Sequence, residues 1–171
     1  TSFTAQELWE ALPGERDEFV LTGEWYTGFD SIEEDAQLND AYWQEILAVK
    51  TEVNRALEQA RKEKTIGSSL EASVTLYASD ELMQKITQLE DELRFVLLTS
   101  LAAVKPMSEA PEEALKTDIE ALVLTLSKAP GKKCERCWHY REDVGTNEKY
   151  DDLCVRCVDN VEGEGESRRY A

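Results

Sequence analysis

Hydrophobic residues recur every three or four positions between Asn39 and about Lys64. They are Tyr42, Ile46, Val49, Val53, Leu57 and Ala60. This spacing places them on one face of a helix, and charged residues fill the other face. We therefore predict one long amphipathic helix whose aliphatic face packs in a core. We expect Gly67 to break it, because glycine is a poor helix former.

The pattern changes to alternation in the next segment. Apolar and polar residues alternate over Ser73–Tyr77, which predicts a half-buried strand. Ser79 is then placed to cap a short helix from Asp80 to about Glu90, and the more continuously apolar run Leu93–Leu98 predicts a second strand. Strand, helix and strand within about thirty residues indicate a small βαβ-like unit.

Two other segments complete the fold prediction. Near the start, Thr4 and Glu7 have the spacing of a capping box, and Phe3 and Leu8 that of a hydrophobic staple, so we predict a helix that ends at Pro13-Gly14. Residues 112–128 fit a helix and a strand about equally.

For residues 112–128 we favour a short helix after Pro111 and a third strand over about 120–127. Together these elements predict an α+β, multi-part fold: a helical segment, a small α/β unit with about three strands, and a cysteine-rich end.

All four cysteines lie in that end, as two Cys-x-x-Cys pairs, Cys134 with Cys137 and Cys154 with Cys157, sixteen residues apart. This spacing is typical of four thiolates that bind one Zn²⁺ tetrahedrally, and four protein ligands leave no open position, so we predict a structural zinc. We expect His139, the single histidine, to be a surface or neighbouring residue and not a ligand. Two disulfides or a redox pair are the alternatives, but no export signal is visible and redox pairs usually occur singly.

The charge of the chain is uneven. Residues 1–127 carry ten Lys and Arg against 26 Asp and Glu, whereas residues 128–171 carry nine against ten. Because phosphate binding needs local positive charge, only the second segment is a candidate nucleic-acid surface. Arg136 and Arg156, one inside each cysteine pair, can instead offset the negative charge of a zinc tetrathiolate.

The sequence leaves these two interpretations open. A cationic, aromatic surface would suit single-stranded RNA, whose bases stack on rings and guanidinium planes. The candidate residues for such a surface are Arg136, Trp138, Lys132, Lys133, Arg168 and Arg169.

No catalytic motif is visible in the sequence. One histidine next to the cysteines cannot build a Ser-His-Asp constellation, and no glycine-rich phosphate loop occurs. No apolar run reaches the ~18 residues of a membrane span, and the start lacks the features of a signal peptide. We expect no membrane association and no catalysis by this chain alone. Because the chain does not begin with methionine, we also expect it to be part of a longer one.

Several stretches taken together resemble a known family. SFTAQELWEALPGER, NDAYWQEILAVKTEVNRALEQARKEKTIGSSLEASVTLY, ELRFVLLTS, KCERCWHY and CVRC follow one another as in the C-terminal region of bacterial isoleucyl-tRNA synthetases. The resemblance covers essentially the whole chain. It is most specific at Ile66–Ala72 and at the Cys-x-Arg-Cys-Trp finger.

This resemblance implies a class I ligase of the cytoplasm that joins isoleucine to its tRNA with ATP. The His-Ile-Gly-His and Lys-Met-Ser-Lys-Ser signatures are absent, so ATP and Mg²⁺ would bind only in a catalytic domain outside this chain. Residues 1–66 would end the helical anticodon-binding domain, 67–129 would form an α/β junction, and 130–171 a zinc-binding tail.

In the family this tail reaches the anticodon stem-loop, which places Arg136 and Trp138 nearest the anticodon. The implied partners are the isoleucine tRNA and the remainder of a monomeric synthetase. Two alternatives are kept. The finger also resembles that of formamidopyrimidine-DNA glycosylases, which would make it a DNA-binding module, although the preceding residues do not resemble those enzymes. It could also be a protein-interaction module that zinc only stabilises.

Overall fold

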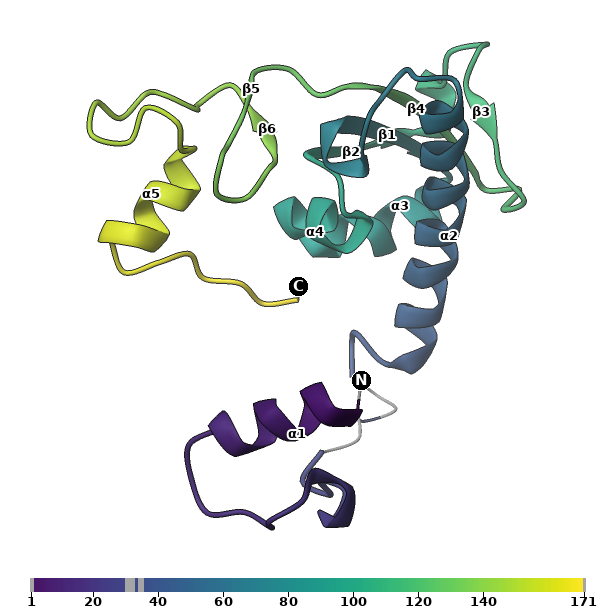
Figure 1. The fold of residues 1–171 in the computed structure, drawn as a ribbon. Helices are drawn as coiled ribbons and strands as arrows, with labels where there is room; N and C mark the ends of the chain where they lie inside the picture. Colours follow the sequence, from purple (N-terminus) through teal and green to yellow (C-terminus); the bar gives the residue numbers. More distant parts are fainter. Residues whose placement is uncertain (1, 30–32, 34–35, 171) are drawn as a thin grey trace. The chain divides into compact units, whose positions relative to one another are not determined.

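The computed structural model describes residues 2–29, 33 and 36–170. The chain divides into two compact units, Thr1–Ala36 and Gln37–Ala171. Helices, a four-stranded sheet and a cysteine-rich end confirm the α+β prediction (Figure 1). The predicted division at residues 66/67 and 129/130 stays a prediction.

The first unit consists of the helix α1 (Ser2–Ala11) and the 3-10 turn η1 (Val20–Thr22). Side chains of α1 hold the following loop in place. The Gln6 amide donates to the Glu18 carbonyl at 2.9 Å and accepts from the Val20 N–H at 3.0 Å, and the Trp9 indole donates to the Asp17 carbonyl at 2.8 Å. Neither α1 nor η1 contains a buried residue.

The predicted start of α1 is wrong. The helix begins at Ser2, so Thr4 lies inside it and cannot be its cap. Phe3 is 89% exposed, which leaves no hydrophobic staple to Leu8. The predicted end is close to the observed one, since α1 ends at Ala11, two residues before Pro13.

The long helix is confirmed as α2 (Asp40–Lys62), and its apolar stripe is buried. Asn39 caps it by accepting from the Tyr42 N–H at 3.0 Å. The expected stop at Gly67 is wrong, because the chain leaves the helix earlier, through a left-handed residue at Lys64 with φ of 60°. Left-handed caps of this kind commonly end helices.

The second unit contains a sheet of four strands, β1 (Ala72–Ala78), β2 (Leu101–Pro106), β3 (Leu115–Lys116) and β4 (Leu122–Lys128), in the order β2-β1-β4-β3. β1 and β2 are parallel, and β4 is antiparallel to both β1 and β3. The parallel pair with helices between its strands confirms a βαβ unit, and β4 confirms the predicted strand at 120–127. Figure 1 shows α2 running beside this sheet.

The predicted strand at 93–98 is wrong. After α3 (Asp80–Ile86), which Ser79 caps as expected, and the 3-10 segment η3 (Thr87–Glu92), residues Leu93–Leu97 form the helix α4. Leu93 and Leu97 are both buried, four positions apart as on one face of a helix. A left-handed Leu98 ends α4, and β2 follows three residues later.

The predicted helix after Pro111 is also wrong. Past the 3-10 turn η4 (Met107–Glu109), residues 115–116 pair with β4 as β3. The turn at Asp118, between β3 and β4, is fixed by a residue far away in the sequence, because the buried Glu52 carboxylate of α2 accepts the Asp118 N–H at 3.1 Å. A contact between positions so far apart has no local signature in the sequence.

The cysteine-rich end forms a finger with the two-stranded ribbon β5 (Lys132–Lys133) and β6 (Tyr140–Arg141), followed by α5 (Val155–Glu162). It has a small hydrophobic cluster of its own, separate from the core of the α2–sheet region. Within the described ranges no helix is long and apolar enough to cross a membrane.

Candidate metal centre and the adjoining arginine cluster

The first cysteine pair sits in a tight knuckle. The Trp138 N–H donates to the Cys134 carbonyl at 2.8 Å, and the Cys134 N–H donates to the His139 carbonyl at 2.9 Å. Trp138 closes this turn in the left-handed region, with φ of 64°. The knuckle therefore aims two sulfur atoms inward and leaves the indole 59% exposed.

The second pair lies at the start of α5. Cys154 is the residue before the helix, Cys157 falls in its first turn, and both are buried. The two knuckles meet directly, since the Cys154 N–H donates to the Cys134 sulfur at 3.4 Å. Amide donors of this kind stabilise a thiolate and orient it as a ligand.

The four sulfur atoms fit a zinc ion. All of them lie within 4.8 Å of one another, and the Sγ atoms of Cys137 and Cys154 are 3.8 Å apart. A tetrahedral site with zinc–sulfur bonds of about 2.3 Å requires sulfur–sulfur distances of about 3.8 Å. The arrangement is a four-cysteine zinc-binding cluster, and zinc held there would cross-link the two knuckles.

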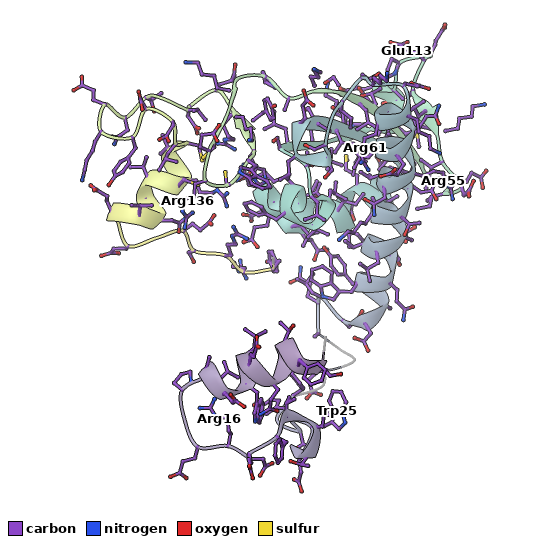
Figure 2. All side chains as sticks on the ribbon, viewed as in Figure 1. Arg16, Trp25, Arg55, Arg61, Glu113 and Arg136 are labelled. Atoms are coloured by element: carbon purple, nitrogen blue, oxygen red, sulfur yellow. The ribbon has the colours of Figure 1, made fainter. Side chains whose placement is uncertain are left out.

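The two arginines of the Cys-x-Arg-Cys pairs cross over to the opposite knuckle. Arg136 donates to the Cys157 sulfur at 3.6 Å, and Figure 2 shows Arg136 in the finger beside α5. Arg156, in turn, acts on Cys137 and helps to lower the pKa of that thiol. Each positive charge therefore offsets the negative charge of the cluster.

The thiols differ in their pKa values. Burial raises the pKa of the Cys154 thiol to about 12. Burial also acts to raise the pKa of Cys137, but hydrogen bonds from His139 and Arg156 outweigh it and lower that pKa to about 5. Zinc binding must therefore release protons from the thiols with a raised pKa, such as that of Cys154, because zinc binds the thiolate form.

His139 is buried and not at the surface. Its Nδ1 lies 3.2 Å from the Cys137 carbonyl, and its ring packs edge-on against Phe95 of α4, with 5.8 Å between ring centroids. Its Nε2 has no hydrogen-bond partner.

Five of the six predicted RNA-binding residues fall into two groups. Lys132, Lys133 and Trp138 belong to the outer part of the finger, where the Lys133 ammonium lies 5.3 Å from the centre of the Trp138 ring. Arg136 and Arg168 instead line a cavity of about 560 Å³ between the finger and α4, together with Phe95, His139, Arg156 and Glu166. Arg169 lies apart from both groups, over the ring of Tyr170 at 5.1 Å.

Sequence reasoning missed the residues that organise this cavity. Phe95 was assigned to a strand, yet its ring carries the Arg168 guanidinium at 4.0 Å and that of Arg156 at 5.0 Å. Glu166 forms ion pairs with both Arg156 and Arg168. Glu166 is one of three closely spaced glutamates in the tail, so nothing in the sequence distinguishes it from Glu162 and Glu164.

Comparison with known proteins agrees with this geometry. A family model described as "Zinc finger found in FPG and IleRS" matches residues 131–160. Proteins named isoleucine–tRNA ligase match the whole chain: one from Pseudoalteromonas atlantica is 56% identical over 171 residues, and one from Shewanella sediminis 55% identical over 170. A third, from Vibrio campbellii, is 56% identical over 170 residues. The chain spans only 18% of the length of each of these relatives.

The cysteine cluster and the family model thus define residues 131–160 as a zinc finger similar to the one found in FPG and IleRS. Along its full length, the chain is homologous to a segment of the isoleucine–tRNA ligases.

Proposed function

We propose that the chain is the C-terminal, tRNA-binding part of an isoleucine–tRNA ligase and that its finger contacts the anticodon stem-loop of the isoleucine tRNA. The observation that carries this proposal is the position of Trp138. A left-handed turn in the first knuckle presents its indole to solvent beside the Lys133 ammonium. An exposed ring with a neighbouring cation is the arrangement on which unpaired RNA bases stack.

In this proposal catalysis belongs to the remainder of a monomeric, cytoplasmic enzyme, which would bind ATP and Mg²⁺ and join isoleucine to the tRNA. The chain itself contributes binding and a structural zinc. Isoleucine-dependent pyrophosphate exchange by the zinc-loaded chain alone would contradict this division of labour.

The test compares tRNA binding by the zinc-loaded chain and its Trp138→Ala variant in fluorescence anisotropy at fixed salt. Stacking of one base on an aromatic ring contributes about 1–3 kcal/mol, so we expect the affinity for the isoleucine tRNA to fall by about five- to 150-fold. Trp138→Phe is the matched control, because it keeps a ring at the same position, and it should retain most of the affinity.

The competing functions predict other results. A DNA-binding finger would prefer duplex DNA over the isoleucine tRNA, and a protein-interaction module would bind neither. Equal affinity of Trp138→Ala and the unchanged chain for the isoleucine tRNA would remove the anticodon contact from the proposal. Zinc content and melting temperature are measured in parallel. If Trp138 has only a structural role, Trp138→Ala should lower the zinc content and the melting temperature and leave the affinity for tRNA unchanged.

A further inference from the structure

The cavity between the finger and α4 contains a carboxylate of the chain itself, that of Glu166. The Glu166 carboxylate accepts from Arg156 at 3.0 and 3.2 Å, from Arg168 at 2.8 Å and from the Asn160 amide at 3.2 Å. We call Arg156, Arg168 and Asn160 the anion cage. Two guanidinium groups and an amide that converge on one anion are the arrangement with which proteins hold carboxylates and phosphates.

Aromatic packing and charge build the cage. The Phe95 ring contacts both arginines of the cage, and the guanidinium of the buried Arg94 lies 4.6 Å from the centre of the same ring. Desolvation by burial acts to raise the pKa of Glu166, but the hydrogen bonds and charges of Arg168 and Arg156 outweigh it and lower that pKa to about 2. The Glu166 carboxylate is therefore charged at neutral pH.

The cavity also contains an unused polar group. His139 is nine-tenths buried and lines the cavity, and its Nε2 has no hydrogen-bond partner in the structure. Buried polar atoms nearly always have a partner. The Nε2 atom therefore points to a ligand that the cavity can receive.

Glu166 is attached in a way that allows it to leave. Gly165, directly before it, has φ of 85°, a conformation that glycine adopts without strain. Beyond it, the Glu92 carboxylate accepts the N–H groups of Arg169 and Tyr170, each at 2.7 Å. Residues 163–170, which we call the strap, are thus held at two separate points, and the Glu166 point can open while the Glu92 point stays closed.

We propose that the anion cage is a binding site for one phosphate of RNA and that Glu166 is its displaceable internal occupant. A phosphodiester carries one negative charge and two free oxygens, as a carboxylate does, so the exchange keeps both the charge and the donor pattern of the cage. The inference rests on the proposed RNA-binding function, but it concerns a different set of residues from Trp138 and Lys133. It assigns Glu166 the role of a competitor that weakens RNA binding.

The test removes the competitor and keeps the cage. Glu166→Gln has nearly the same size and no charge, so the zinc-loaded chain should bind the isoleucine tRNA about three- to tenfold more tightly in fluorescence anisotropy at fixed salt. Glu164→Gln is the matched control: it removes the same charge from an exposed position of the strap and should change the affinity less than twofold. Adding Arg168→Ala to Glu166→Gln should abolish the gain.

If Glu166→Gln binds RNA as tightly as the unchanged chain, or more weakly, with zinc and melting temperature retained, Glu166 is only a structural clamp and the proposal fails. Dependence of RNA binding on Trp138 would then still support the proposed function. If the chain binds no RNA, inorganic phosphate is titrated against the ¹⁵N signals of the Arg156 and Arg168 side chains in Glu166→Gln. A shift would show a site for free phosphate and overturn its assignment to RNA, and no shift would overturn the site itself.

Discussion

The hydroxyl of Ser100 joins three segments that lie far apart in the sequence. It donates to the Leu70 carbonyl and accepts the Tyr140 N–H at 2.7 Å, 40 positions away. Ser100 itself is fully buried, and its own N–H donates to the Ala72 carbonyl at 3.0 Å. A single hydroxyl therefore fixes the β6 strand of the finger against the start of the sheet.

Replacing Ser100 by alanine should lower the free energy of unfolding by about 1–3 kcal/mol, because a partly buried donor and a partly buried acceptor lose their partner. The measurement is urea unfolding of the zinc-loaded chain, combined with hydrogen exchange at the Tyr140 amide. Ser108→Ala, at an exposed serine, is the control and should change stability by no more than about 0.5 kcal/mol. Unchanged protection of the Tyr140 amide in Ser100→Ala would contradict the bridging role.

The C-terminal turn of α2 shows how a helix ends without glycine. The Thr65 N–H donates to the Ala60 carbonyl at 2.9 Å and the Lys64 N–H to the Arg61 carbonyl at 3.1 Å, which is the Schellman arrangement. Its left-handed position is occupied by Lys64, where glycine is usual. The turn is therefore formed at the expense of backbone strain.

Lys64→Gly should relieve that strain and raise the free energy of unfolding by roughly 0.5–1 kcal/mol, after allowance for the greater freedom of glycine in the unfolded chain. Lys62→Gly, the last residue of α2, is the matched control and should lower it by about 1 kcal/mol. Thermal unfolding of the two variants compares them directly. A lower melting temperature for Lys64→Gly would contradict the strained cap.

Among the helices and strands, the sequence correctly predicted those whose patterns depend on residues close together in the chain. The stripe of α2, the alternation of β1 and the cap at Ser79 depend on neighbours within a few positions, as does the spacing of the cysteines. The run at 93–98 failed because a short apolar segment fits a buried strand and a buried helix alike. The cage around Glu166 could not be predicted, since its contact with Phe95 is brought about by the fold alone.

In the larger unit, two hydrophobic clusters differ in what holds them together. The cluster of α2, the sheet and α3 is built mainly from aliphatic side chains, whereas three of the five buried residues in the finger cluster are Cys134, Cys154 and Cys157. A segment whose core consists mainly of its zinc ligands has little apolar surface to fold on its own. We therefore expect zinc to be the principal source of stability for the finger.

Removal of zinc by a chelator should unfold mainly residues 130–165 and leave the α2–sheet region folded. Hydrogen exchange followed by mass spectrometry measures this, with the β1 and β4 amides as the internal control. Fast exchange should appear in the finger and revert when zinc is restored. Slow exchange of the finger amides without zinc would show that the apolar cluster suffices.

The strap has a consequence for the order in which the chain assembles. Its last contact joins Glu92 to Tyr170, 78 positions apart, and Tyr170 packs against the core that α2 and the sheet form. Ring closure over such a separation is entropically costly until the intervening segments are compact. We therefore expect α4 and the zinc-bound finger to form before the strap closes, which makes docking of the strap a late step of folding. In refolding started by addition of zinc, a fluorescent label near Tyr170 should report later than one in the finger.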